Sequence, residues 1–342
     1  MHSDLKLDFV MTWVDDSDPA WKKEYQKYKG VAAAEDTAQS DGASAERFRN
    51  WDNLRYWFRG VEQYAPWVNK IFFVTCGQCP AWLNKEHPKL VLVDHKDYIP
   101  EKYLPVFSSH PIELNLHRIK ELNENFVYFN DDIFILNPLT PEDFFVEGKP
   151  REMAVEFPLY ANQEDSFNHI LLNMSLVLNT HFKKKQVIKK NFKKWFHPVY
   201  GKYLLNNVCM ARFGTFSGIL TPHFPSSLNK THMAQVWEEL YEEFDKTCSH
   251  RFRSPEDINQ YTFRFWNMMS GNFCPTNFDK YARFININNS NVGQICNWIE
   301  SGSLKLLCMN DSKGIENFSA VQQQINDSFE RKFSKKSAFE IS

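Results

Sequence analysis

Three polar residues interrupt an otherwise apolar run, FVYFNDDIFIL, which extends from Phe126 to Leu136. They are Asn130, Asp131 and Asp132. Burying two adjacent carboxylates costs several kcal/mol unless something compensates their charge. An acidic pair directly after a strand commonly holds a divalent cation, which in turn binds the diphosphate of a nucleotide. The alternative is a turn in which the aspartates cap the backbone, and the motif alone does not separate the two.

Hydrophobic periodicity predicts the elements that must position these carboxylates. Four apolar, β-prone runs predict strands at 7–14, 70–77, 89–95 and 126–136. Two segments with helical spacing predict helices at 47–65 and 112–122. Strands that alternate with helices indicate an α/β fold, here a Rossmann-like nucleotide-binding mixed sheet. Ligands in such sheets lie at the carboxyl ends of the strands, so Asp15, Asp94 and Asp131 are expected to converge there.

The segment after the first strand combines a helix start with a polar stretch. Ser17 or Asp18 can cap a helix whose first turn contains Pro19. Residues 29–46 are small and polar, which predicts a mobile loop beside a strand end, where a lid could form.

Residues 150–220 predict a helical insertion in the α/β fold. Within it, 181–195 contain seven lysines, and Ile188, Phe192 and Trp195 recur at helical spacing. Such a basic amphipathic helix meets an anionic membrane or an anionic acceptor, or else its lysines are simply solvated, which is the more common case.

The last third of the chain carries fewer signals. Residues 232–245 predict a helix. The tail beyond about residue 315 is polar and is expected to be peripheral.

The composition excludes several classes of protein. The chain has 342 residues, 40 Lys plus Arg, 42 Asp plus Glu and a net charge of −2, so no overall basic field favours nucleic acid. No apolar run approaches the roughly 18 residues of a membrane span, and the N-terminus does not resemble a signal peptide. We therefore expect a soluble, cytoplasmic protein, at most peripheral to a membrane. Aromatic residues make up 15%, which fits a sugar-binding cleft or, more commonly, a Phe-rich core.

The seven cysteines are scattered along the chain, as buried thiols usually are. Cys76 and Cys79 form a CxxC motif, CGQC, but no second pair stands at zinc-site spacing and His87 alone does not complete a site. A redox role is one interpretation. A turn after a strand, with two incidental thiols, is the more common one.

Several blocks, in order, resemble the Stealth family. Its first two conserved regions are matched by TWVDDSDPAW, RFRNWDNLRYWFRGVEQYAPWVNKIFFVTCGQ, HPKLVLVDHKDYIP, LPVFSSHPIELNLHRI and FVYFNDDIFILNPLTPEDFF. Two further blocks, at 221–258 and at 304–311 (LKLLCMND), are similar to its later regions. The resemblance covers most of residues 7–145 and 219–311.

Stealth proteins are sugar-1-phosphate transferases. The resemblance therefore implies transfer of hexose-1-phosphate from a nucleotide diphosphate sugar, expected to be UDP-linked, to a hydroxyl of a capsular or cell-surface polysaccharide or oligosaccharide, forming a phosphodiester. Mg²⁺ or Mn²⁺ is the expected cofactor, because hard oxygen ligands and phosphate suit these ions. In lacking a membrane span and large insertions, the chain resembles the bacterial members of the family. This resemblance implies a cytoplasmic location, at most peripheral at the inner face of the membrane.

Two positions depart from the family's pattern. The family usually has Gly at the position of Asp16 and Asp at the position of Cys76. The second departure removes one acidic group from the expected site. It also weakens the redox interpretation of CGQC, because the rest of the motif persists without needing a thiol.

By resemblance, Asp132, His223 and Arg253 match residues that the family needs for activity. His223 is the expected base for the acceptor hydroxyl, with Asp132 as its rival. Arg253 is expected to hold the transferred phosphoryl oxygens.

Each of these assignments has an alternative. His223 could be an ordinary surface histidine, with His232 and His250 as nearby competitors. Arg253 could form a salt bridge with Glu256 or Asp257, and the two aspartates of the NDD motif could be purely structural.

Further residues are expected at the nucleotide and the metal. Candidates for nucleotide contact lie at a strand end, at the start of the next helix and in the last block; they are Asp15, Arg47, Asp52, Arg55 and Asn310. Candidate metal ligands are Asp131, Asp132 and Asp311.

The expected organisation has four parts: a nucleotide-sugar-binding α/β part (1–149), a helical insertion on the acceptor side (150–220), a segment that completes the catalytic domain (221–315) and a peripheral tail (316–342). Two other functions stay open at this point, namely a conventional metal-dependent glycosyltransferase that makes a glycosidic bond, and a non-catalytic carbohydrate-binding protein. The coincidence of the NDD motif, His223 and Arg253 in one chain disfavours the second of these.

Overall fold

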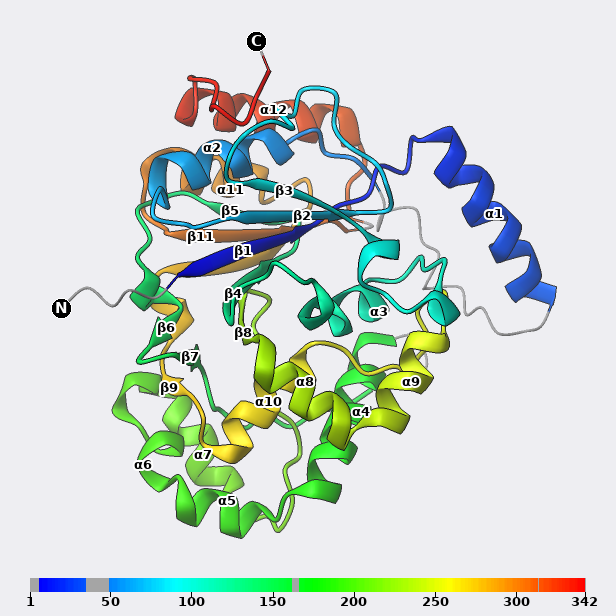
Figure 1. Ribbon diagram of the computed structural model, residues 1–342. Helices are drawn as coiled ribbons and strands as arrows, with labels where there is room; N and C mark the ends of the chain where they lie inside the picture. Colours follow the sequence, from blue (N-terminus) through cyan, green and yellow to red (C-terminus); the bar gives the residue numbers. More distant parts are fainter. Residues whose placement is uncertain (1–5, 35–48, 162–165, 313, 342) are drawn as a thin grey trace.

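The structure, a computed structural model, describes residues 6–34, 49–161, 166–312 and 314–341. Two halves lie one above the other in Figure 1. The two larger sheets and the helices at 54–64, 292–301 and 318–332 form the upper half, and the helices between 166 and 270 form most of the lower half.

The central sheet has five strands in the order β3-β2-β1-β4-β8. The first four are parallel, and β8 runs antiparallel to β4. β1 and β2 are almost completely buried, as expected of parallel strands that are covered on both faces. The bounds are β1 Leu7–Thr12, β2 Ile71–Thr75, β3 Leu90–Asp94, β4 Asn125–Phe129 and β8 Ser226–Asn229. This mixed sheet confirms the predicted Rossmann-like α/β class, although the polar sequence SSLN of β8 gave no strand signal.

The chain leaves the central sheet at the polar triplet. After a turn in which the Ile133 N–H donates to the Asn130 carbonyl (3.2 Å), it continues as β5 (Ile133–Ile135) in a second sheet of order β10-β11-β5. β11 (Leu306–Asn310) is parallel to β10 (Ala282–Asn286) and antiparallel to β5. The predicted break at the carboxylates is therefore a change of sheet.

A small third sheet joins the two halves, with β6 (Phe145–Val146), β7 (Lys149–Glu152) and β9 (Cys274–Pro275) in that order.

Helices α2 (Leu54–Tyr64), α11 (Val292–Ser301) and α12 (Phe318–Lys332) cover the upper side of the sheets. α2 approaches β5 closely because it has Gly60 at the contact, where a Cβ would lie 2.6 Å from the Ile135 carbonyl oxygen. α12 packs on α2, with the rings of Tyr56 and Phe329 stacked at a centroid distance of 5.1 Å.

The C-terminal tail is part of this packing. Ile325, Phe329 and Phe333 are buried, and the buried guanidinium of Arg59 in α2 binds Glu340 at 2.7 Å and Glu330 at 3.0 Å. This corrects the expectation of a peripheral tail, because its apolar residues and its carboxylates are bound to α2.

Helix α1 (Pro19–Ala34) begins as predicted. The Asp18 carboxylate accepts hydrogen bonds from the backbone N–H groups of Ala20 (2.7 Å) and Trp21 (3.0 Å). The loop predicted at 29–46 is wrong at its start, because α1 continues to Ala34; residues 35–46, and with them the predicted lid, lie outside the described residues.

Two other predicted helices are shorter than expected. α2 begins at Leu54 rather than at 47, and Asp52 precedes it with a positive φ of 48°, which an α-helix does not accommodate. Of the helix predicted at 112–122, only α3 (Ser109–Leu114) and one 3₁₀ turn form. The side chain of Asn115, between them, donates to the Pro111 carbonyl oxygen (2.8 Å).

The lower half contains the remaining helices: α4 Ser166–His181, α5 Lys184–Lys190, α6 Phe192–Trp195, α7 Leu204–Met210, α8 Lys230–Glu239, α9 Tyr241–Ser249 and α10 Tyr261–Ser270. The single basic helix predicted over 181–195 is wrong, because α5 and α6 part at Asn191 (φ −116°, ψ 27°). The helix predicted at 232–245 likewise divides at Leu240 (φ −117°, ψ 36°).

We predict that Arg59→Met destabilises the protein by about 3–5 kcal/mol, because it leaves the carboxylate of Glu340 buried without its partner. The side chains of Arg59 and Glu340 are only 6% and 3% exposed. Urea unfolding followed by tryptophan fluorescence measures the change. The matched control is Arg331→Met, which breaks a solvent-exposed pair with Glu300 and should have a much smaller effect. Equal effects of the two substitutions would contradict the assigned role of the buried pair.

Candidate active site

A cleft of about 1450 Å³ opens at the carboxyl ends of β1 and β4. This is the edge at which ligands bind in open α/β sheets. The cleft is lined by Trp13, Trp51 and Asp311, by the NDD triplet and, from the segment 150–220, by Phe167, Lys202 and Tyr203.

The NDD triplet is fixed from below by a buried polar network. The Tyr128 hydroxyl lies 3.0 Å from the Thr12 hydroxyl, donates to Glu113 (3.2 Å) and accepts from the Asn130 side chain (3.2 Å). On the other side, the Met309 N–H donates to the Asp132 carbonyl (2.9 Å), which fixes the turn to β11. The position of both carboxylates is therefore set by the packing of two sheets.

The two carboxylates differ in their surroundings. Water in the cleft reaches the Asp131 side chain, while Oδ1 of Asp132 is buried and has no hydrogen-bond partner among the described residues. Although the Asp131 side chain is exposed to the cleft, the surrounding walls desolvate it, and this effect, followed by the like charge of Asp132, raises the pKa of Asp131 to about 7. The protein's own groups therefore compensate only part of the negative charge of these two carboxylates.

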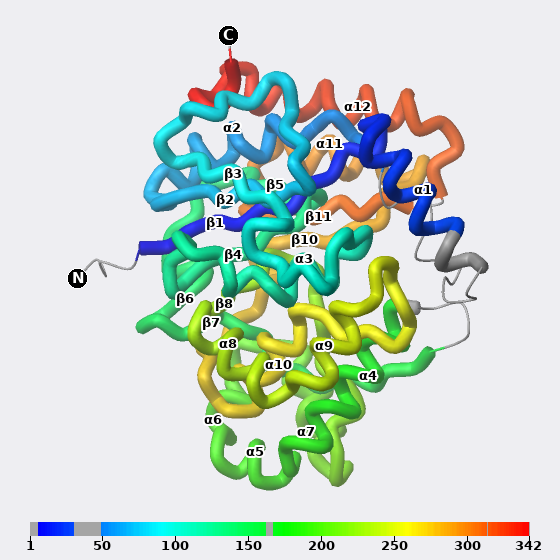
Figure 2. The backbone as a smooth tube through the Cα atoms, turned by 45° about the vertical axis from the view of Figure 1, so that its right-hand side comes forward, coloured from blue at the N-terminus to red at the C-terminus, as the bar shows by residue number. Residues whose placement is uncertain are grey.

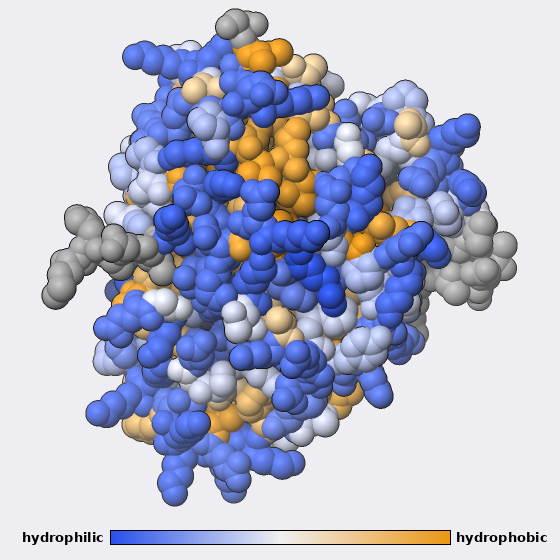
Figure 3. Space-filling view, viewed as in Figure 1, coloured by the Kyte–Doolittle hydropathy of each residue, from blue (hydrophilic) through white to orange (hydrophobic). Residues whose placement is uncertain are grey.

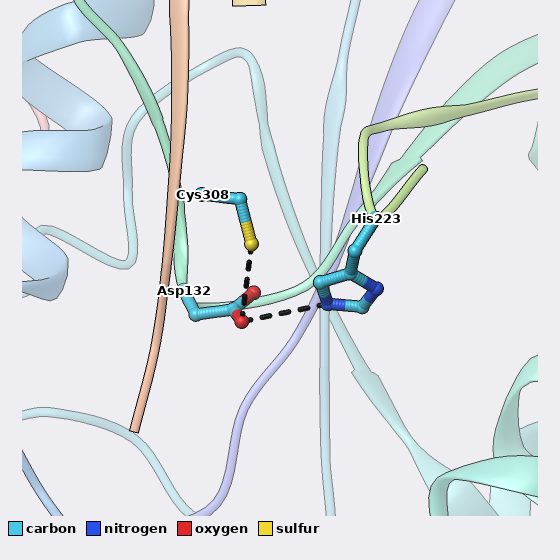
Figure 4. A group of neighbouring side chains, drawn as sticks. All are labelled: Asp132, His223 and Cys308. Atoms are coloured by element: carbon cyan, nitrogen blue, oxygen red, sulfur yellow. Dashed lines mark hydrogen bonds and ion pairs between the residues drawn. The ribbon is translucent and has the colours of Figure 1, made fainter. Parts of the chain in front are cut away.

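Asp132, His223 and Cys308 meet in a compact cluster, shown in Figure 4. Oδ2 of Asp132 lies 3.4 Å from Nε2 of His223 and accepts from the Cys308 thiol at 3.3 Å. Nδ1 of His223 lies 2.9 Å from the Tyr261 hydroxyl, which orients the ring. Burial opposes the imidazolium, but Tyr261, Cys308 and Asp132 outweigh it and hold the pKa of His223 well above its usual range.

Two members of this cluster were not selected from the sequence. Cys308 is in the LKLLCMND block, and burial, followed by the charge of Asp132, raises the pKa of its thiol to about 12, so it stays protonated and donates. Tyr261 begins α10 and has no sequence signal that distinguishes it from a core aromatic.

The competing histidines lie outside the cleft. His232 contacts the Phe263 carbonyl oxygen at 3.3 Å, and His250 binds Asp257 at 2.7 Å. Neither lines the cleft, whereas His223 does.

Arg253 points into the same cleft, where its guanidinium donates to the Ser109 hydroxyl (3.0 Å). Among the described residues it forms no salt bridge with the two acids proposed as alternatives. Glu256 pairs with Lys246, and the buried Asp257 pairs with His110 and His250. Asp257 also accepts from the Ser254 N–H (3.0 Å), so it fixes the loop that presents Arg253.

The expected nucleotide contacts are divided between the cleft and its surroundings. Asn310 lines the cleft and donates to the Asn286 side chain (2.7 Å). Asp15, Asp52 and Arg55 are not among the lining residues: Asp15 accepts from Ser17, and Asp52 pairs with Arg55 on the surface at 3.1 Å. Arg47 lies outside the described residues.

The expected convergence of three strand-end aspartates is not found. Asp131 lines the cleft, but Asp15 and Asp94 do not. Asp94 caps the turn that follows β3, accepting from the Lys96 N–H at 3.1 Å. Local capping therefore accounts for a strand-end aspartate without a ligand.

The structure places Arg49 and Trp51, which the sequence did not single out, beside Asp311. Arg49 holds both carboxylate oxygens of Asp311 at 2.9 Å, and the Trp51 indole donates to one of them at 3.1 Å. Asp311 lines the cleft, but its oxygens are already hydrogen-bonded, so as a metal ligand it would have to exchange these partners.

The residues around Asp132 could hold a divalent cation. Asp131 and the unpartnered Oδ1 of Asp132 supply oxygen ligands, which suit Mg²⁺ or Mn²⁺. Asp132, His223 and Cys308 offer a softer set, with ligand atoms within 4.8 Å of one another, which is more typical of zinc. The orphaned carboxylate oxygen is the feature that a bound cation would satisfy.

The CGQC motif forms a turn. Gly77 has a φ of 85°, which favours glycine, and the Thr75 hydroxyl donates to the Gln78 carbonyl (2.7 Å). The pKa of the Cys76 thiol is raised to about 11, mainly by burial. Because a reactive cysteine needs a lowered pKa, this favours the interpretation as a turn.

Comparison with known proteins adds a family to this geometry. Residues 6–30, 47–153 and 222–269 match the models described as Stealth protein CR1, conserved region 1; CR2, conserved region 2; and CR3, conserved region 3. These three regions include the polar triplet, His223 and Arg253.

Full-length relatives support the match. The chain is 40% identical over 338 residues to the capsular polysaccharide phosphotransferase WcwK of Streptococcus pneumoniae, with 98% of each chain covered. It is 35% identical to the receptor polysaccharide phosphotransferase WefC of Streptococcus oralis over 98% of this chain and 99% of the relative. Identity to the exopolysaccharide phosphotransferase cps2G of Lactiplantibacillus plantarum is 34%, over 98% of this chain and 96% of the relative. The chain therefore belongs to the Stealth family.

Proposed function

We propose that this enzyme transfers hexose-1-phosphate from a nucleotide diphosphate sugar to a hydroxyl of a capsular or cell-surface polysaccharide. The observation that carries the proposal is the meeting of Asp132, His223 and Arg253 in one cleft, at the ligand-binding edge of the sheet, in a chain similar throughout to polysaccharide phosphotransferases. The expected donor is UDP-linked.

The reaction is a displacement at phosphorus. The acceptor oxygen attacks the phosphorus that bears the hexose, the P–O–P bridge breaks, and the nucleoside monophosphate leaves. The proton of the acceptor hydroxyl passes to the His223–Asp132 pair. His223 is the preferred acceptor in its neutral form, and because its pKa is raised, the fraction of neutral His223 grows as pH rises. Because Asp132 stabilises the imidazolium that forms, the two residues act as one unit.

Arg253 supplies fixed positive charge at this centre. Ser109 positions its guanidinium, which can form two parallel hydrogen bonds with phosphoryl oxygens. Asp131 and Asp132 would hold Mg²⁺ or Mn²⁺, and the ion would neutralise charge on the diphosphate. This role explains why the protein leaves those two carboxylates partly uncompensated.

We assign the two ends of the cleft to the two substrates. Trp13, Arg49 and Trp51 follow β1 and precede α2, where a nucleotide would bind in a Rossmann-like sheet. Phe167, Lys202 and Tyr203 come from the segment 150–220 and would contact the acceptor. Among the described residues, no helix combines the length and the apolar character that crossing a membrane requires.

The chemical test is the identity of the products. With purified protein, a panel of nucleotide sugars and Mg²⁺, we expect release of nucleoside monophosphate and a sugar–phosphate–sugar signal in the ³¹P spectrum. Release of nucleoside diphosphate with a glycosidic product would instead support a conventional glycosyltransferase.

We predict that His223→Ala and Asp132→Asn each lower kcat by about 10²–10⁴, as expected when a general base is lost. The assay is monophosphate release at saturating donor. His181→Ala and Asp327→Asn are matched controls at exposed positions outside the cleft and should retain full activity. Unchanged activity in both site variants would refute the assigned roles.

We predict that Mn²⁺ binding tightens as pH rises from about 6 to about 8. A carboxyl group must lose its proton to bind a metal, and the pKa of Asp131 is raised to about 7, so affinity should increase by up to about tenfold per pH unit below that value and then level off. Electron paramagnetic resonance of free Mn²⁺ measures the binding without any reaction. Asp131→Asn should bind weakly with a much flatter pH dependence, and a wild-type affinity that does not change with pH would count against this carboxylate as a ligand.

We predict that Phe284 forms the platform for the acceptor sugar. Its ring is 43% exposed, lines the cleft and meets the His223 ring edge-on at a centroid distance of 6.0 Å. Phe284→Ala should raise the acceptor KM by about tenfold, since such an aromatic contact contributes about 1.5 kcal/mol. Phe284→Tyr preserves the ring and should have the acceptor KM of the wild type. Donor hydrolysis without acceptor should be the same in the wild type, Phe284→Ala and Phe284→Tyr. A change in donor KM instead of acceptor KM would place Phe284 on the other side of the reaction.

A further inference from the structure

The segment 166–220 has an unusual charge composition. It contains eight lysines, one arginine and no aspartate or glutamate, although the whole chain has a net charge of −2. Positive charge is therefore concentrated between 183 and 212, in and around α5, α6 and α7, which both views place at the end of the molecule remote from α12 (Figures 1 and 2).

Two of the lysines have structural roles, and these determine where the others point. The ammonium of Lys184 is buried and bonds to Glu156 (2.8 Å) and to the carbonyl oxygens of Met210 (2.7 Å) and Thr215 (3.3 Å). Lys194 donates to the carbonyl oxygens of Gly271 (2.6 Å) and Phe273 (2.8 Å). With these two turned inward, the remaining lysines of α5 and α6 are exposed: Lys183, Lys185, Lys189, Lys190 and Lys193. Among the described residues, none of these five forms a salt bridge.

Apolar side chains are exposed in the same region. Of the twelve large hydrophobic side chains that are exposed in the described residues, eight lie between 157 and 213. The buried face of α7 is fixed by Asn207, whose amide donates to the carbonyl oxygens of Ala154 (2.8 Å) and Trp195 (2.6 Å). Leu205 (66% exposed) and Val208 (55% exposed) therefore point outward, on the opposite side of the helix.

The lysines and the apolar side chains belong to one surface. The bonds from Lys184 to Met210 and Thr215 join the start of α5 to the end of α7 and the turn after it, so the helix that carries the exposed lysines is anchored to the segment that carries Leu205, Val208 and Phe213. We call these exposed residues of α5, α6 and α7 the basic apolar face. In Figure 3, orange areas among blue side chains mark the lower end of the molecule, where these helices lie.

We propose that the basic apolar face binds the surface of a membrane that contains anionic lipids. Lysines attract anionic headgroups, and aliphatic side chains gain free energy by entering the boundary between headgroups and acyl chains. A soluble anionic polysaccharide would use the lysines but would give no benefit to exposed Leu205 and Val208. The same segment supplies Phe167 and Lys202 to the cleft, so a docked molecule would have its membrane-binding surface and its cleft on one segment.

The test is cosedimentation of the whole chain with lipid vesicles, which requires neither donor nor acceptor and is therefore independent of the proposed function. Wild type should bind vesicles of phosphatidylcholine with about 30% phosphatidylglycerol at about 0.1 M salt, bind pure phosphatidylcholine at least tenfold more weakly, and dissociate as salt is raised. Equal partition onto both vesicle types, or no binding to either, overturns the proposal.

Matched variants separate this surface from charge in general. K185Q/K189Q/K190Q should lower the partition coefficient at least tenfold, whereas K85Q/K335Q/K336Q, with the same change of charge on exposed lysines outside the lower half, should not. L205S/V208S should weaken binding, and L92S/I341S, at exposed sites elsewhere, should not. Circular dichroism verifies that each variant is folded.

Two other results would overturn the proposal. Binding to hyaluronan without binding to anionic vesicles would show that the face recognises a polyanion. Dimerisation of the wild type that L205S/V208S abolishes, measured by light scattering, would show that a second copy of the chain covers it.

Discussion

The geometry of the site depends on the pairing of β4 with β8. Tyr128 lies opposite Ser226 in antiparallel register, so the residues before Ser226 continue past the end of β4, in the direction taken by the NDD triplet. This brings His223 and Asp132 to the same edge, with side-chain atoms 3.4 Å apart. A slip of one residue would turn the side chains of β8 to the opposite face. The hydrogen bond from Asn229 to Asn125 (2.7 Å) holds this register, which explains how so polar a strand can be specific.

A second constraint is the charge that this register brings together. Asp132 receives a histidine and a thiol, which compensate one of its oxygens but leave the other buried and unpartnered. Two other buried carboxylates, those of Glu152 and Asp257, have partners on both oxygens. Arg264 donates to both carboxylate oxygens of Glu152, the shortest bond being 2.8 Å. Asp257 accepts from two histidines and a backbone N–H. Asp132, by contrast, keeps one oxygen without a partner among the described residues, at the edge where a ligand would enter, which is expected when ligand and cation supply the missing partners.

What the sequence could reveal was mostly local. Apolar runs that end in polar residues predicted β1 to β4, and the position of the NDD triplet at a strand end predicted a feature of the cleft. The pairing of Arg49 with Asp311 was not predictable, because it joins positions far apart in the chain and no local pattern encodes it. The break at Asn191 had a similar origin, since Lys194 is drawn to the carbonyl oxygens of Gly271 and Phe273 and so overrides the helical spacing. The expected nucleotide contacts Asp52 and Arg55 satisfy each other instead, as adjacent opposite charges on a surface often do.

The segment 150–220 shows how buried ion pairs can determine a surface. In its described part the acids are Glu152 and Glu156, and both are fully buried with a cation, Arg264 and Lys184 respectively. No acid in the described part therefore remains on the outside to neutralise the exposed lysines. Removing a charge pair from water costs free energy, and hydrophobic side chains of similar size would often be as stable or more stable at such places. The Lys184 ammonium binds both Glu156 and the Met210 carbonyl oxygen, which joins the start of α5 to the end of α7. The ion pair thus removes an acid from the surface and helps to orient α5, whose other lysines stay exposed.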